Sequence, residues 1–304
     1  MRTRSRALVG ALAVAWIGAA CSDNSTGLNP DQAQVQAAYE GLTGYTDEDF
    51  GDAGAISTTP TATVSPSPSI ADTAIAPLFW GRDRVVPGGP RPVFTRNIVI
   101  QGDSAWVTRG TSFQGTFLVD TSADAVFNPT SKPLADGVQQ RGVFVRDASA
   151  PHGWRAVSLT LRSWQNTDLS RRTVQIQSVA VYVNGSLRLS VGDPDSLITI
   201  EPVIPRFHEG DTVRVVAHVD NSTGGGFSPA TLVFLHVRHA DPTGIRWRRV
   251  PMTDHGNGEF ERRWVVRYPG RDRFVVDALD AATLVLGTAD NYRSNEWGIP
   301  FRVE

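Results

Sequence analysis

The chain has 304 residues, with 29 Lys and Arg against 31 Asp and Glu, so its formal net charge is −2 at pH 7. A slightly acidic protein has no electrostatic reason to bind nucleic acid, and we expect no such partner. Cys21 is the single cysteine, which excludes a disulfide within one chain and leaves stability to packed cores.

The N-terminal segment has a positive head and a short apolar run that ends at the cysteine. Arg2, Arg4 and Arg6 precede an apolar run over 7–17, which is too short to span a bilayer as a helix. This pattern is typical of a secretory signal peptide. Its end, "GAAC", resembles the lipobox of bacterial lipoproteins. The resemblance implies a signal peptide and acylation of Cys21, whereas an ordinary signal peptide cut nearby would leave a free thiol.

The lipoprotein resemblance also implies a location. Removal of residues 1–20 takes away three Arg and no acids, so the charge of the mature chain is −2 − 3 = −5. Ser22 rather than an Asp follows the cysteine, and in lipoproteins this implies no retention at an inner membrane. We therefore expect a protein of the bacterial cell envelope, lipid-anchored at the outer membrane or cell surface. Whether it faces the periplasm or the outside stays open.

Residues 21–75 are expected to form a lipidated tether that contains one short helix. Asn29 and Pro30 are typical of a helix N-terminus, and apolar residues at helical spacing predict a helix over 30–43. The following segment, "STTPTATVSPSPSIADTAIAP", has the composition of a linker or long loop.

Residues 76–192 show the period-two pattern of antiparallel strands. Turn signals at Gly102-Asp103 and Asn184-Gly185 predict hairpins. In "VQIQSVAVYV" the apolar phase switches partway, which predicts a bulge or a strand that passes between sheets. A helix before long hairpins, with "GWRAVSL" near the end, resembles the NTF2-like fold over 30–190. A plain β-sandwich or a small barrel explains these strands equally well.

Residues 196–304 are expected to form a second unit with alternating strands. The run "WRRVPMTDHGNGEFERRWVV" joins a strand, a small apolar step, a Gly-rich turn and a strand that opens with an aromatic residue. It resembles a run in bacterial immunoglobulin-like and fibronectin type III-like sandwiches, and the match covers 198–304. Short strands with regular turn spacing predict a sandwich independently. The expected fold class is therefore mainly β, or α+β when the N-terminal helix is included.

Metal sites find little support in the pattern. His236 and His239 are three residues apart, so on a strand they point to opposite faces and we predict no transition-metal site. Asp277, Asp280 and Asp290 supply oxygens of the kind that calcium prefers, but without the order of an EF-hand loop. We expect no cofactor, with structural calcium on these three residues as the alternative. Asx residues in turns need no ion to explain them.

Catalytic motifs are not recognisable, and aromatic residues provide the remaining candidates. The run "GTSFQG" around Ser112 lacks the G-x-S-x-G spacing of a nucleophile elbow, and no Gly-rich loop opens a helix. Four tryptophans could together form a platform on which a sugar ring stacks, although such residues are more often core or partly buried rim residues. These candidates are Trp80, Trp247, Trp264 and Trp297.

These patterns together predict a non-enzymatic protein. We expect a lipid-anchored extracytoplasmic binding or scaffold protein whose partners are the membrane, through its lipid, and an unidentified protein or glycan. The alternative is a hydrolase of a cell-envelope or extracellular polymer, with the immunoglobulin-like unit as an accessory domain. Both expectations rest on analogy with folds rather than on an assembled site.

Overall fold

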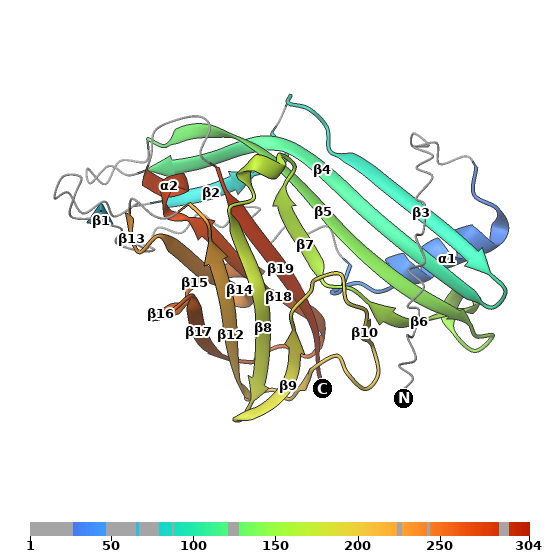
Figure 1. The fold of residues 1–304 in the computed structure, drawn as a ribbon. Coiled ribbons are helices and arrows are strands. Elements are labelled where there is room, and N and C mark those ends of the chain that lie inside the picture. The colour runs from blue at the N-terminus through green and yellow to red at the C-terminus, as the bar shows by residue number, and fades with distance from the viewer. Residues whose placement is uncertain are drawn as a thin grey trace, which may run out of the picture.

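The computed structural model describes residues 27–46, 65–66, 79–86, 88–120, 128–223, 227–241, 244–285 and 292–304. The fold is mainly β, as predicted, and sandwich-like, with a small amount of helix (Figure 1). The elements in chain order are α1 (Pro30–Glu40), β1 (Ser65–Pro66), β2 (Phe79–Asp83), β3 (Val93–Gln101), β4 (Ser104–Asp120), β5 (Thr130–Arg146), the 3-10 helix η1 (Pro151–Gly153), β6 (Trp154–Leu159), β7 (Arg162–Asn166), the 3-10 helix η2 (Leu169–Arg171), β8 (Val174–Val183), β9 (Ser186–Val191), β10 (Ile198–Thr199), β11 (Arg206–Phe207), β12 (Thr212–Asn221), β13 (Phe227–Ser228), β14 (Thr231–Asp241), β15 (Gly244–Pro251), β16 (Thr253–Gly256), β17 (Glu259–Val265), β18 (Gly270–Asp280), α2 (Ala281–Val285) and β19 (Ser294–Val303).

Two sheets carry the architecture. The larger has twelve strands, and its main path runs β10-β6-β5-β7-β19-β18-β14-β15, with β4 on β5, β2 and β3 on β4, and β11 on β19. The smaller has five strands in the order β16-β17-β12-β8-β9, and β1 pairs with β13 separately. In Figure 1 the small sheet lies in front of β14, β18 and β19, while β3, β4 and β5 extend past it toward α1.

Helix α1 begins where the sequence predicts. The side chain of Asn29 accepts a hydrogen bond from the backbone of Gln32, whose own side chain accepts one from the backbone of Asn29, and Pro30 starts the first turn. The helix ends at Glu40 rather than at 43, because Gly41 follows as its C-cap. Val35 and Tyr39 are its buried residues and attach it to the sheet.

The predicted hairpins and the phase switch are confirmed. β3 and β4 join at Gly102-Asp103, and β8 and β9 join at Asn184-Gly185, where both turn residues have positive φ. The register between β8 and β12 shifts between His218 and Val219, so a bulge returns the second half of β8 to the core.

Strand pairing runs across the boundary expected near 192–196. β8 pairs with β12, β7 pairs with β19, and β6 pairs with β10, so strands from both expected units share each main sheet. Both sheets therefore depend on segments from 76–192 and from 196–304, and the break between these segments is not a break between sheets.

The two faces of the large sheet have different roles. We call the face on which the small sheet packs the sandwich face. Its core contains Phe274, Val276 and Ala278 of β18 against Val215 and Ala217 of β12, among other buried residues. We call the opposite face the inner face, because the sheet curls around it. Trp80 of β2 there packs against Phe234 of β14, with ring centroids 5.1 Å apart.

Candidate functional site

A polar groove lies on the sandwich face, in a part of the large sheet that the small sheet leaves uncovered. Its volume is about 460 Å³. β3, β4, β5 and β7 supply the floor, and Arg172 before β8 and Asp195 after β9 stand at its sides. The polar side chains of the floor come from Thr95, Thr108, Ser112, Gln139, Ser163 and Gln165.

Strand register places these side chains in two rows across the sheet. One row runs from Ser112 of β4 through Gly137 of β5 to Gln165 of β7, and the other pairs Gln139 with Gly110 and with Ser163. Cross-strand neighbours share a face, so each row presents its side chains to the groove. A glycine lies within each row. The Thr95 hydroxyl lies over Gly110 and the Thr167 methyl lies near Gly137, so neighbouring threonines occupy the space that a side chain at either glycine would take.

The floor of the groove is neutral and its hydrogen-bonding groups are available. Within the described residues, the side chains of Thr95, Thr108, Ser112 and Gln139 make no hydrogen bond with the protein. Hydroxyl and amide groups both donate and accept hydrogen bonds. The groove therefore offers a set of neutral donors and acceptors that the fold itself does not use.

The charged groups at the sides of the groove are already engaged. Asp195 forms an ion pair with Arg141 at 2.8 Å, and the Nε of Arg172 donates to the backbone oxygen of Asn166 at 2.7 Å. These contacts hold the two segments that wall the groove. Arg141 compensates the charge of Asp195, whereas Arg172 keeps its positive charge at one side of a neutral floor.

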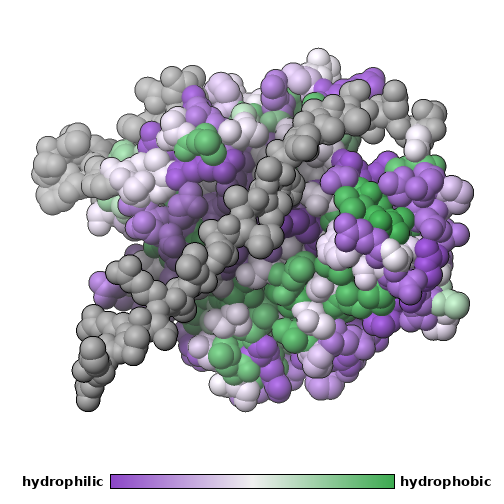
Figure 2. Space-filling model, turned by 45° about the vertical axis from the view of Figure 1, so that its right-hand side comes forward, coloured by the Kyte–Doolittle hydropathy of each residue, from purple (hydrophilic) through white to green (hydrophobic). Residues whose placement is uncertain are grey.

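Trp106 lies on the same face as the groove, two residues along β4 from Thr108. Trp106 is 41% exposed, and its cross-strand neighbour Val99 is also 41% exposed. Figure 2 shows that hydrophobic residues form patches within a mostly hydrophilic surface on the face it displays. Sequence reasoning missed Trp106, although it shares the outward phase of Thr108, Gly110 and Ser112 in β4.

The four tryptophans expected to form a platform lie apart instead. Trp80 and Trp297 are buried, the first on the inner face and the second in the sandwich core. Trp264 is partly buried and packs edge-on against Phe274, with ring centroids 5.1 Å apart. Trp247 is partly buried on the inner face near Arg273. These positions fit the alternative of core or rim residues, because strand alternation turns the rings inward.

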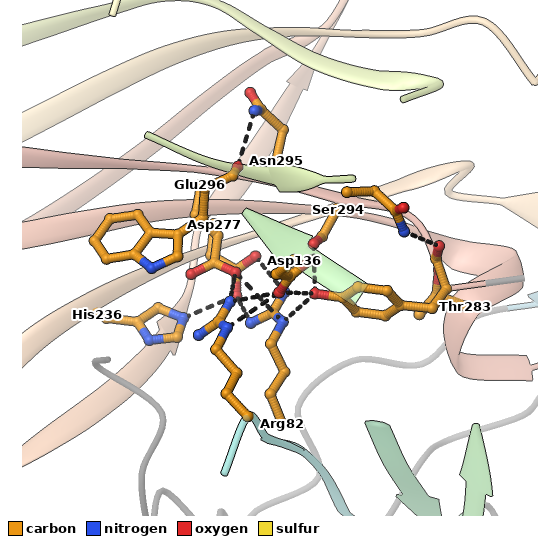
Figure 3. Close-up of polar contacts among 12 residues, drawn as sticks. Arg82, Asp136, His236, Asp277, Thr283, Ser294, Asn295 and Glu296 are labelled. Carbon is orange, nitrogen blue, oxygen red and sulfur yellow. Dashed lines mark hydrogen bonds and ion pairs between the residues drawn. The ribbon is translucent and has the colours of Figure 1, made fainter. Parts of the chain in front are cut away.

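The inner face contains a cluster of buried charges around Arg82 of β2 (Figure 3). The guanidinium of Arg82 makes a bidentate contact with the carboxylate of Asp277, at 2.7 and 2.8 Å, and its Nε donates to the Tyr292 hydroxyl at 2.8 Å. Asp277 also contacts the Nε2 of His236 at 3.0 Å. The cluster thus ties β2 to β14 and β18.

Arg84 extends this cluster of buried charges to two further strands. It pairs with Asp136 of β5 at 3.0 Å and makes a short contact with Glu296 of β19. The Tyr292 hydroxyl donates to Asp136 at 2.9 Å. We call Arg82, Arg84, Asp136, His236, Asp277, Tyr292 and Glu296 together the buried ion cluster.

The pKa values in the buried ion cluster follow from its pairing. Burial opposes ionisation of Asp277, but Arg82 and His236 outweigh it and hold the pKa of Asp277 well below its usual range. Burial alone would lower the pKa of Arg84, yet Glu296 and Asp136 raise it. Charges that are fixed and mutually compensated in this way stabilise one arrangement of strands, and we assign the cluster a structural role.

The residues considered for calcium are used in other contacts. Asp277 belongs to the buried ion cluster, and Asp280 accepts from the backbone of Ala282 at 2.9 Å and contacts Arg293 at 3.4 Å. Asp290 lies outside the described residues. Within the part of the chain that is described, no group of three or more His, Cys, Asp or Glu could hold a metal ion. The expectation about calcium stays a prediction.

A second pocket, of about 520 Å³, lies between the end of α1, the β5–β6 turn and the segment after β10. Its polar groups are mostly committed within the protein. Asp147 accepts from the backbone and hydroxyl of Ser149 and pairs with Arg155 at 3.0 Å, and Glu201 pairs with Arg206 at 3.1 Å. We therefore favour the polar groove, because four of its six polar floor side chains have no hydrogen-bond partner within the described residues.

Several expectations concern residues outside the described ranges. Cys21 with its signal peptide lies there, and so does most of the expected linker over 57–77. Among the helices that the structure describes, none has the length and apolar character needed to cross a membrane.

Comparison with known proteins identifies no relative. The chain matches no family model, no curated protein and no solved structure.

Proposed function

We propose that the chain is a lipid-anchored, extracytoplasmic binding protein whose ligand occupies the polar groove without being chemically changed. One observation carries the proposal: neutral hydrogen-bonding side chains from several strands converge on one groove, and those of Thr95, Thr108, Ser112 and Gln139 have no hydrogen-bond partner within the described residues. Sites of this kind orient a ligand through a few well-placed polar groups. Their rigidity comes from the sheet, which holds Ser112, Gln139 and Ser163 in fixed register.

The chemistry of the groove favours binding over hydrolysis. Hydrolysis of glycosidic bonds commonly uses two carboxyl groups that flank the scissile bond. Asp195 is the one carboxylate among the described residues that line the groove, and it is paired with Arg141. The alternative of an envelope-polymer hydrolase therefore gains no support from this site.

The two-layer architecture is compatible with the immunoglobulin-like topology inferred from the sequence. Sandwiches commonly present a binding surface on a stiff support, although a fold by itself does not define a function. In this proposal the sandwich core is the support, and the extended strands β3, β4 and β5 carry the ligand.

The lipid anchor would keep the groove near a membrane. Cys21 precedes the first described residue, Gly27, by six positions, and a chain of that length reaches about 20 Å when fully extended. An acylated Cys21 would thus hold α1 close to the membrane surface. This part of the proposal rests on the lipobox resemblance.

The groove is tested by removing one of its amides. Gln139→Leu keeps much of the volume but removes a donor and an acceptor from the floor, whereas Gln177→Leu makes the same change at an exposed site of β8 outside the groove. The full chain in detergent would be applied to an array of envelope glycans and peptides. We expect one class of ligand that Gln139→Leu loses and Gln177→Leu keeps. Equal binding by both variants would contradict the assignment of the groove.

The anchor is tested separately. Wild type and Cys21→Ala would be labelled metabolically with a fatty-acid analogue in a bacterial host and exposed to protease on intact cells. We expect label on wild type alone, and protease sensitivity would indicate a surface location. Absence of label on both proteins would contradict the anchor while leaving the groove unaffected.

A further inference from the structure

We infer that the ligand of the polar groove is a neutral glycan chain and that Trp106 stacks against one of its sugar rings. The inference rests on the proposed function, since it names the ligand of the same groove. The juxtaposition that carries it is an exposed indole in line with a floor of hydroxyl and amide groups on one face of β3, β4, β5 and β7.

Trp106 continues the groove along β4. It is two residues from Thr108, which lines the groove, and side chains two apart on a strand share a face about 7 Å from one another. The pairing of Trp106 with Val99 of β3 and Val143 of β5 places a flat apolar surface beside the polar floor. Along the outward side of β4, the apolar indole of Trp106 is thus followed by the polar side chains of Thr108 and Ser112.

A sugar ring matches both parts of this surface. Its C–H face is apolar and suits a flat aromatic ring, while its hydroxyl groups at the rim donate and accept hydrogen bonds. The Thr, Ser and Gln side chains of the floor donate and accept as well. From Trp106 to Ser112 the strand covers about 20 Å, which suits a chain of several sugars better than a single one.

The charges around the groove argue against other ligands. An anionic glycan or a phosphorylated ligand would need several cations, but Arg141 is paired with Asp195, and Arg172 is the single cation among the described residues that line the groove. An extended peptide would add to a sheet edge, whereas the groove lies on a face. A membrane surface would suit Trp106 and Val99, but it leaves the neighbouring polar floor without a role.

A cross-strand Trp–Val pair also stabilises a hairpin, so the test must separate binding from folding. Trp106→Ala removes the ring, Trp106→Phe restores an aromatic face, and Leu187→Ala removes an exposed apolar side chain at the far hairpin of β8 and β9. The full chain in detergent would be titrated calorimetrically with maltohexaose, cellohexaose, xylohexaose and chitohexaose. Oligogalacturonate and vesicles of phosphatidylethanolamine and phosphatidylglycerol would be the comparison probes.

We expect at least one neutral oligosaccharide to bind, with affinity about tenfold weaker in Trp106→Ala, a factor that corresponds to about 1.4 kcal/mol. Trp106→Phe should recover most of the affinity, and Leu187→Ala should bind like wild type. Loss of binding in Gln139→Leu but not in Trp106→Ala would overturn the stacking and leave the groove standing. Binding of oligogalacturonate alone, or of vesicles in a Trp106-dependent manner, would overturn the neutral glycan. If none of these probes binds, and no glycan or peptide of the array binds either, then both the neutral glycan and the proposed binding function are contradicted.

Discussion

The two faces of the large sheet are built from the same strands but use polar residues in opposite ways. On the inner face, Arg82, Arg84, Asp136 and Asp277 are buried and paired with one another. On the sandwich face, beyond the small sheet, the polar side chains of the groove floor are neutral and partly open to solvent, and four of the six have no hydrogen-bond partner within the described residues. Alternation along each strand separates the two sets.

We therefore expect the inner face to determine stability and the groove on the sandwich face to determine ligand binding. Buried charges are costly when a partner is lost, so the inner face fixes how β2 folds over the sheet. Neutral side chains on an open face cost little to keep and remain available for a ligand. Substitutions should therefore affect stability strongly on one face and binding on the other.

The largest effect is expected at the centre of the buried ion cluster. Asp277→Ala leaves the buried guanidinium of Arg82 without its bidentate partner and should lower the free energy of unfolding by about 3–5 kcal/mol. Asp147→Ala removes the exposed pair with Arg155 and the hydrogen bonds from Ser149, and should have a much smaller effect because water screens and replaces these contacts. Urea denaturation measures both, and similar losses in the two variants would remove the distinction between buried and exposed charges.

A smaller effect that depends on pH is expected at Lys132, the only lysine in the chain. Burial lowers its pKa to about 8, whereas an unfolded lysine has a pKa of about 10.4. Between these values the unfolded state binds more protons, so stability should rise with pH, by about 1 kcal/mol from pH 7.5 to 9.

Lys132→Met should abolish this rise, because the variant has no amine to titrate. Unfolding at a series of pH values below 9.5 avoids ionisation of Tyr39 and Tyr292, whose pKa values burial raises. An identical slope in wild type and variant would show that Lys132 is not the group responsible.

The N-terminal cap of α1, the helix at the far end of the inner face, should contribute about 1 kcal/mol to the free energy of unfolding. Asn29→Ala removes the capping side chain of α1 and should destabilise the protein by that amount in thermal or urea unfolding. Gln34→Ala, at an exposed position in the same helix, should have no comparable cost. Equal costs for the two variants would mean that the cap contributes nothing specific.

The smallest effect on stability is expected in the polar groove of the sandwich face. Gln139→Leu should change the free energy of unfolding by no more than about 0.5 kcal/mol, because Gln139 is exposed and makes no side-chain hydrogen bond within the described residues. Differential scanning calorimetry gives the comparison. A loss near that of Asp277→Ala would show that the groove also holds the fold together.

Local signals predicted local structure well. Asn29 and Pro30 located the start of α1, and Asn184-Gly185 located a hairpin, since both depend only on neighbouring residues. The pairing of β8 with β12 joins residues on both sides of the expected boundary, and register between distant strands leaves no local trace. The contact of Arg82 with Asp277 spans 195 positions for the same reason.

The tryptophans show how the residues of the same phase along a strand bear on whether a ring is buried or exposed. Trp297 shares its phase with Ile299, Phe301 and Val303, and all four are buried. Trp106 shares its phase with threonine, glycine and serine and is exposed. The neighbours two positions away therefore distinguish these two rings, whereas Trp164 is buried although Arg162 and Asn166 are its neighbours of the same phase.

The most direct test of ligand binding in the polar groove is to observe which residues a ligand contacts. Two-dimensional NMR of the isotope-labelled full chain would follow backbone amides and tryptophan indoles while a neutral oligosaccharide is added. We expect signals from Ser112, Gln139, Ser163 and the Trp106 indole to shift together with one saturation curve. Shifts confined to the second pocket, around Trp154 and Ile200, or no shift at any of the four, would contradict the assignment of binding to the groove.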